Sequence, residues 1–127
     1  MKGRMISPGH VEGEAIVSPE SIGFYGGIDL NTGMVIEKGH PLEGQSVKGK
    51  ILVFPNGKGS TVGSYVIYGL EKNKVGPLGI INKETETIVA TGAILAGIPC
   101  MDHVDINQIV SGDIVELNAD NGEVLIK

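Results

Sequence analysis

The chain has 127 residues, of which 41% are hydrophobic and 20% are charged, and its formal net charge at pH 7 is −5. This length and composition are typical of a globular protein, so we expect a single domain over residues 1–127 and no intrinsic disorder. The chain lacks the basic clusters and aromatic platforms of nucleic-acid binders, and no apolar run approaches the roughly 18 residues of a membrane span.

The single cysteine, Cys100, bears on the compartment and on metal chemistry. One thiol excludes an internal disulfide and suits a reducing environment. The first residues lack the apolar core and small-residue cleavage site of a secretory signal. We therefore expect a cytoplasmic protein, and one that cannot hold an iron–sulfur cluster alone, because such clusters usually need several thiolates.

Strands dominate the first half of the chain. Alternating apolar residues predict strands at 11–17, closed by Ser18-Pro19, and at 33–37. KGKILVF at 48–54 becomes continuously apolar, as a strand buried on both faces does. Twenty glycines, about twice the usual share, indicate tight turns between these short strands.

The second half alternates helices and strands. Helical spacing of apolar residues predicts helices at 61–73 and 85–97, with a strand at 78–82 between them. The final DIVELNADNGEVLIK has two alternating strands around Asp120-Asn121-Gly122, a hairpin signal. The whole order predicts an α+β fold, with a mixed sheet or partly closed barrel and two main helices.

The loop FPNGKGST (54–61) is the candidate site. It does not match a Walker A phosphate loop, because Lys58 precedes Gly59 and no glycine lies at the required distance. It does not match a dinucleotide fingerprint either, since Gly57 and Gly59 are followed by Val62. A nucleotide-binding role is therefore disfavoured.

Ser60 and Thr61 lie between a buried strand and a helix, which leaves two interpretations open. Unpaired N–H groups at a helix start favour an anion, such as a serine alkoxide or a substrate carboxylate, and Lys58 adds a donor at the rim. Alternatively, Ser60 is an N-cap worth about 1 kcal/mol, and Asn56-Gly57 is a simple turn.

Other polar residues have structural interpretations beside functional ones. Asp29 either faces the active site or a partner, or caps its own turn. His40, before Pro41, is interpreted as a turn residue rather than a ligand, and Cys100 as a small buried apolar residue. The three histidines show no paired spacing, so no intrinsic metal site is expected.

A long block of the sequence resembles a known family. GHPLEGQSVKGKILVFPNGKGSTVGSYVIYGL (39–70), with YGGIDLNTGMVI (25–36) before it and GAILAGIPCMD (92–102) after it, is similar to the small subunit, or swivel domain, of the aconitase X family. The resemblance covers about residues 10–117. It implies a swivelling β/β/α fold, in agreement with the predicted order of strands and helices.

The resemblance also implies roles for the loop. In the wider aconitase superfamily a Gly-Ser-Ser/Thr motif before a helix carries a catalytic serine, and Gly59-Ser60-Thr61 matches it. Ser60 is thereby implied as the general base, with Gly59, Thr61 and Lys58 as substrate contacts. Aconitases continue with Arg-Glu-His, whereas this chain has Val62-Gly63-Ser64. The arginine that grips a substrate carboxylate there is missing, which disfavours a citrate-type substrate.

The implied activity is that of a hydro-lyase subunit. Archaeal members of the family convert (R)-5-phosphomevalonate to trans-anhydromevalonate 5-phosphate. A [4Fe–4S] cluster, held by a large subunit, would act as a Lewis acid on the leaving hydroxyl. This chain would supply the base that removes a proton next to the substrate carboxylate. Dehydration of a hydroxyproline-type acid, as in bacterial relatives, and a non-catalytic swivel-fold binding module stay open as alternatives.

Overall fold

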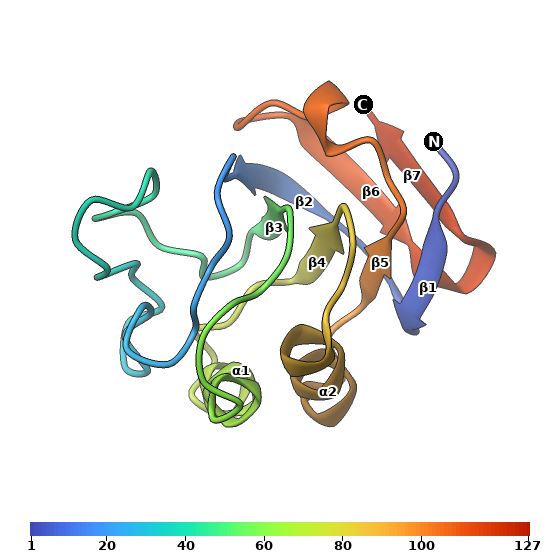
Figure 1. Ribbon diagram of the computed structural model, residues 1–127. Coiled ribbons are helices and arrows are strands. Elements are labelled where there is room, and N and C mark those ends of the chain that lie inside the picture. The colour runs from blue at the N-terminus through green and yellow to red at the C-terminus, as the bar shows by residue number, and fades with distance from the viewer.

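A computed structural model describes residues 1–127, and it contains one sheet, two α-helices and two short 3₁₀ helices (Figure 1). The two α-helices lie side by side against the parallel part of the sheet, and the chain between residues 18 and 50 extends to one side of it. In chain order the elements are β1 (Arg4–Ser7), β2 (His10–Val17), β3 (Ile51–Phe54), α1 (Gly63–Lys72), β4 (Gly79–Asn82), α2 (Thr87–Ala96), β5 (Cys100–Asp102), η1 (Ile106–Gln108), β6 (Ile114–Asn118), η2 (Ala119–Asn121) and β7 (Glu123–Ile126).

The sheet has the strand order β1-β5-β4-β3-β2-β6-β7. Strands β5, β4, β3 and β2 run parallel to one another, whereas β1 pairs antiparallel with β5, β6 with β2 and β7 with β6. The sheet curls until its two edges touch, because Lys2 forms an antiparallel bridge with Glu123. There the N–H of Gly3 donates to the carbonyl of Gly122 at 3.0 Å. The predicted mixed sheet in a partly closed barrel is confirmed.

Side chains that alternate along the central strands fill two separate cores. Along β3, Leu52 and Phe54 face the core beneath α1 and α2, whereas Ile51 and Val53 face the interior of the curled sheet. All four side chains are fully buried, as expected for a central parallel strand covered on both faces. We call the first the helix core and the second the barrel core.

The two helices are where the apolar spacing predicts them. They span 63–72 and 87–96 inside the predicted 61–73 and 85–97, because the residues at the predicted ends are not helical. The helices approach closely at Gly92, where a Cβ atom would lie 2.7 Å from Ile67 Cδ1 and 3.0 Å from the Ser64 carbonyl oxygen. Neither helix combines the length and apolarity needed to cross a lipid bilayer.

Two parts of the sheet differ from the predictions. Residues 33–37 form no strand. Met34 and Val35 make only single bridges, to Ser46 and Ile28, within the segment of turns at residues 18–50. Gly33 adopts φ +74 there and Met34 is exposed, so the apolar run does not continue as an extended strand. Strand β1 is absent from the predictions, because it is fixed by pairing with β5, far away in the sequence.

Candidate active site

The loop that follows β3 carries Ser60, and it is hydrogen-bonded to the segment of turns at residues 18–50, between β2 and β3. The N–H of Ile22 donates to the Asn56 carbonyl at 3.2 Å, and the N–H of Lys58 donates to the Ile22 carbonyl at 3.1 Å. These bonds form a parallel bridge between Ile22 and Gly57. Residues 56–58 are therefore held in place by these hydrogen bonds, and Ser60 lies two residues after them.

Ser60 is exposed and lies two residues before the N-cap of α1. Its Oγ accepts a hydrogen bond from the Val62 N–H at 3.1 Å, and its carbonyl accepts from the Gly63 N–H at 2.9 Å. Val62, not Ser60, is the N-cap, and no side chain caps this helix. The expectation that Ser60 is an ordinary N-cap is therefore wrong. The chain makes an extra turn before the helix, which leaves the hydroxyl at the surface.

The backbone around Ser60 offers unpaired donors. The N–H groups of Gly59, Ser60 and Thr61 find no acceptor in the chain. Gly59 adopts φ +87, a left-handed conformation that glycine takes without a Cβ penalty. Because the start of α1 follows directly, the local field favours negative charge at the Ser60 oxygen or on a ligand beside it.

Two hollows flank Ser60. One, of about 320 Å³, contains Lys58 and Gly59 together with Tyr25, Glu37 and the glycines at 23, 26 and 27. The Lys58 Nζ lies 3.2 Å from Glu37 Oε2, and both side chains remain partly exposed. The other hollow, of about 260 Å³, contains Thr61 and Val62 and lies between the two helices. Gly59, Thr61 and Lys58 are thus near Ser60, on opposite sides of it.

Glu86 is a neighbour of the loop that the sequence analysis did not identify. Its carboxylate caps α2 by accepting the N–H groups of Ile88 at 2.8 Å and Val89 at 2.9 Å. The same carboxylate fills the space next to Gly57, where a Cβ atom would come within 2.3 Å of Glu86 Oε1. An acidic residue just before an apolar helix was the available signal, because a negative charge there stabilises the helix dipole.

Hydrogen bonds from buried polar side chains connect the ends of neighbouring strands next to the loop. The Asn82 amide donates to the Phe54 carbonyl at 3.0 Å, which joins the ends of β3 and β4. Asp102, with its side chain fully buried, pairs with Arg4 at 2.7 and 2.9 Å and accepts the Thr85 N–H at 2.8 Å. Burial alone would raise the pKa of Asp102, but the Arg4 and Thr85 bonds outweigh it and hold the pKa below its usual value.

Asp102 also belongs to the one group of metal-type ligands in the fold. Glu84, Asp102 and His103 each offer a ligand atom, all within 4.8 Å of one another. His103 adopts φ +58, and its Nε2 lies 2.9 Å from Glu84 Oε2. Because Arg4 and Thr85 already occupy the Asp102 carboxylate, this cluster is accounted for as an ion-pair network.

Three further predicted residues have structural roles. The Asp29 carboxylate accepts the N–H groups of Asn31 at 2.7 Å and Thr32 at 3.2 Å, which confirms that it caps its own turn. The buried His40 ring accepts the Leu42 N–H at 3.0 Å and lies 3.1 Å from the Ser21 carbonyl. Cys100 is fully buried, and burial raises the pKa of its thiol to about 12.

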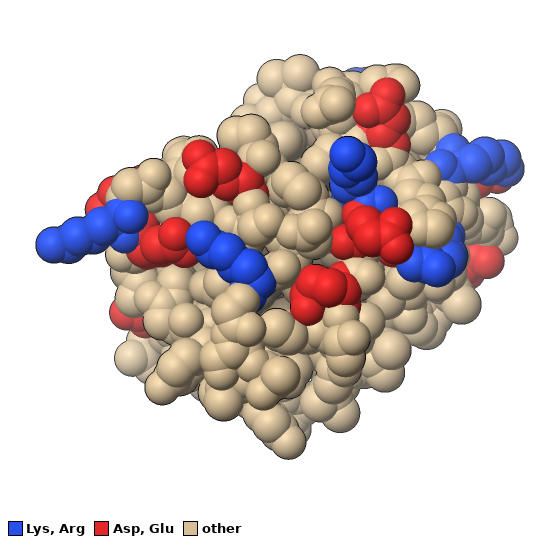
Figure 2. All heavy atoms as spheres, viewed as in Figure 1, with Lys and Arg blue, Asp and Glu red and all other residues tan.

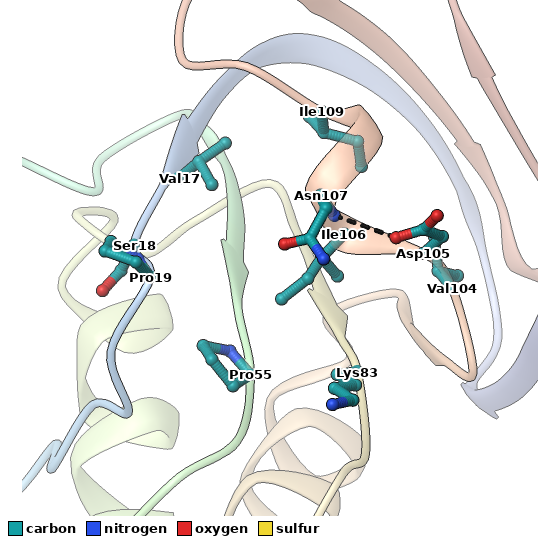
Figure 3. A pocket seen from close by; sticks show the side chains of 10 residues that line it. All are labelled: Val17, Ser18, Pro19, Pro55, Lys83, Val104, Asp105, Ile106, Asn107 and Ile109. Atoms are coloured by element: carbon teal, nitrogen blue, oxygen red, sulfur yellow. Dashed lines mark hydrogen bonds between the residues drawn. The ribbon is translucent and has the colours of Figure 1, made fainter.

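The largest hollow, of about 470 Å³, is not at Ser60 (Figure 3). It opens at the carboxyl ends of the parallel strands on the barrel-core side, between Pro55 and the 3₁₀ helix η1. Lys83 and Asn107 are among its polar side chains, and the Asn107 N–H is already bonded to Asp105. None of the predicted site residues lines it.

The curled half-barrel with its helix pair is a swivel-type domain. A profile of the aconitase X swivel domain matches residues 1–126, so the chain belongs to this family and the predicted resemblance is confirmed. A relative from Thermococcus sibiricus, named "Phosphomevalonate dehydratase small subunit", is 54% identical over 127 residues, covering 100% of this chain and 98% of the relative.

Two further matches agree with this family. A protein of the same name from Methanocaldococcus jannaschii is 56% identical over 126 residues, covering 99% of this chain and 96% of that protein. The crystal structure of Thermococcus kodakaraensis aconitase X, described as a holo-form, has a TM-score of 0.98 at 55% identity. It covers 99% of this chain and 96% of that one. The predicted swivelling β/β/α fold is therefore confirmed.

Proposed function

We propose that this chain is the small subunit of a heteromeric hydro-lyase that dehydrates (R)-5-phosphomevalonate to trans-anhydromevalonate 5-phosphate. The observation that carries the proposal is near-complete coverage, at 54–56% identity, by relatives named as small subunits of that dehydratase. A small subunit requires a large-subunit partner, and the substrate is a small phosphorylated acid. The alternative substrate is a hydroxyproline-type acid.

Ser60 is the proposed general base. As an alkoxide, its Oγ would take a proton from the carbon next to the substrate carboxylate and become a hydroxyl. The Val62 N–H already donates to this oxygen, and no charged side chain of α1 lies in its first turn to oppose an anion. Exclusion of water by the partner would strengthen these dipoles, because they act more strongly in a low dielectric.

Substrate contacts are proposed on both sides of Ser60. The unpaired N–H groups of Gly59 and Thr61 are donors suited to carboxylate or phosphate oxygens. Lys58 would supply positive charge, but it is now paired with Glu37. Because an exposed pair of this kind contributes little stability, an anionic substrate can compete with Glu37 for the ammonium group.

An iron–sulfur cluster does not fit the residues of this chain. Cys100 is its one cysteine, and the buried thiol, with its pKa near 12, stays protonated and out of reach. In this proposal a [4Fe–4S] cluster belongs wholly to the large subunit. The roles of this chain are to hold the base and to contact the substrate.

The test is reconstitution with the large subunit under anaerobic conditions. The complex is expected to dehydrate (R)-5-phosphomevalonate, and Ser60→Ala to lower kcat by about 10²- to 10⁴-fold, the usual contribution of a general base. Ser111→Ala is the matched control, since Ser111 is also exposed and its Oγ also accepts one backbone N–H, from Val17 at 2.9 Å. Full activity is expected in this control.

Each other outcome would change the proposal. Undiminished turnover by Ser60→Ala would remove Ser60 from catalysis. Turnover of a hydroxyproline-type acid, without turnover of phosphomevalonate, would reassign the substrate. A complex that assembles but is inactive on both acids would favour a non-catalytic binding module.

A further inference from the structure

The outer surface of the helix pair carries almost no charge. Every residue from Thr87 to Met101 is uncharged, and so is every residue from Gly59 to Leu70. Figure 2, in which the helices are seen end-on as in Figure 1, agrees: the acidic and basic side chains gather in the upper part of the view, and the lower part, where α1 and α2 lie, has almost none. A surface helix normally directs charged residues toward water, but α2 has none, and its exposed side chains are Thr87, Thr91, Ile94 and Leu95.

Large apolar side chains are exposed on this uncharged area. On α2, Ile94 is 57% exposed and Leu95 is 52% exposed. Next to the other helix, Tyr65 is 69% exposed and Val62 is 45% exposed. We call the area the helix surface and define it by these exposed or half-buried residues: Val62, Tyr65, Tyr68, Ile88, Ile94 and Leu95.

The helix surface is continuous with the Ser60 loop. The hollow of about 260 Å³ between the helices is lined by Thr61 and Val62 of the loop, by Tyr65 of α1, and by Ile88 and Thr91 of the α2 region. Thr61 follows Ser60 directly in the chain. A partner that covers this hollow therefore reaches the serine without crossing another part of the molecule.

We propose that the helix surface is the docking surface for the large subunit, an inference that rests on the proposed function. The chain cannot supply the cluster itself, so the partner must approach Ser60 closely. Interface cores are depleted in charge and enriched in tyrosine, as this surface is. Glu71 and Lys72, at the end of α1, lie at its border and match the polar rim of such interfaces.

The exposed apolar residues of the terminal hairpin, in contrast, lie among charged side chains. On the terminal hairpin, Ile114 and Leu125 are exposed, but Glu116 pairs there with Lys127 and His10. The surrounding charges would have to be dehydrated on docking, which opposes burial of that area. The helix surface avoids this cost.

The test measures affinity between this chain and its large subunit. Leu95→Lys and Ile94→Lys are expected to raise the Kd by about tenfold or more each, as for anchor residues of an interface. Lysine in the last turn of a helix is favourable for the helix dipole, and both sites are exposed, so folding should be retained. Val110→Lys is the matched control, because Val110 is 64% exposed and lies in the turn before β6.

The readouts are isothermal titration calorimetry for affinity, circular dichroism for folding, and sedimentation of the chain alone for self-association. A Kd within threefold of the original for both variants would overturn the docking surface, even if the complex is active. Self-association that Leu95→Lys abolishes, with unchanged heteromer affinity, would assign the surface to a second copy instead. Ser60→Ala should bind normally, so loss of activity in that variant tests the proposed function separately.

Discussion

Ion pairs are distributed unequally between two parts of the molecule: the sheet, which we call the strand half, and the helices α1 and α2, which we call the helix half. Ion pairs join the strands and their termini, as in Lys2–Glu123, Arg4–Asp102 and Lys127–Glu116. No residue of α1 or α2 takes part in any ion pair. The strand half therefore has a surface suited to water, whereas the helix half exposes apolar side chains around Ser60. This contrast is what the proposed partner would explain.

The largest expected effect comes from shortening one core side chain in each half. Phe54 ends β3 in the helix core, with its ring 5.9 Å from that of Phe24, and Leu117 fills the barrel core. Phe54→Ala should lower the free energy of unfolding by about 3–5 kcal/mol and Leu117→Ala by about 2–5 kcal/mol, through lost burial and a cavity. Chemical denaturation measures both.

The same pair separates stability from function. Phe54 comes directly before the Ser60 loop, so Phe54→Ala should also lower kcat of the reconstituted complex at a temperature where the variant is folded. Leu117→Ala should leave kcat unchanged under the same conditions. Equal losses of kcat in both variants would show that the loop depends on the whole fold and not on the helix core.

A smaller effect is expected from removing the cap of α2. Glu86→Ala leaves the N–H groups of Ile88 and Val89 without their acceptor, which should cost about 1 kcal/mol of stability. It also empties the space beside Gly57, so we expect weaker hydrogen-exchange protection in residues 56–62. Glu86→Gln, which keeps the size and one acceptor, should fall between Ala and the original residue. Unchanged exchange in the loop would mean that Glu86 serves α2 alone.

The smallest effect is expected at an exposed ion pair of the strand half. Hydrogen bonds from Lys127 and His10 hold the pKa of Glu116 below its usual value of 4.5. A depressed carboxyl pKa stabilises the fold above the unfolded-state value and loses this contribution as the pH falls through the folded-state value. Lys127→Met should therefore raise the pKa of Glu116 in an NMR titration and weaken the acid dependence of stability. Because the pair is exposed, the Tm at neutral pH should fall only slightly.

Sequence patterns among near neighbours predict much of the fold, but they predict little of what surrounds the candidate site. Apolar spacing predicts α1 and α2, and alternation predicts the terminal hairpin, because these patterns depend on near neighbours. Strand β1 depends on pairing with β5 across most of the chain, and no local pattern reveals that. The predicted strand at 33–37 is wrong, because its apolar residues belong to the segment of turns at residues 18–50 and make only isolated bridges there.

The loop shows the same division. Its sequence identifies Gly59, Ser60 and Thr61 as a strand-to-helix turn, and the family resemblance suggests the base. The partners that fix the loop, Ile22 and Glu86, come from distant segments, and their contacts require the folded sheet. The extra turn that separates Ser60 from the N-cap is a matter of backbone geometry, which the residue types leave open.

The sealed thiol of Cys100 has a practical consequence. Because this cysteine is fully buried and stays protonated at neutral pH, it should not react with maleimide dyes or nitroxide labels while the domain is folded. A cysteine introduced at an exposed position such as Val110 would then be the one reactive thiol in the chain. Paired with a label on the large subunit, it would allow fluorescence or spin-label distances to test whether the domain moves during turnover.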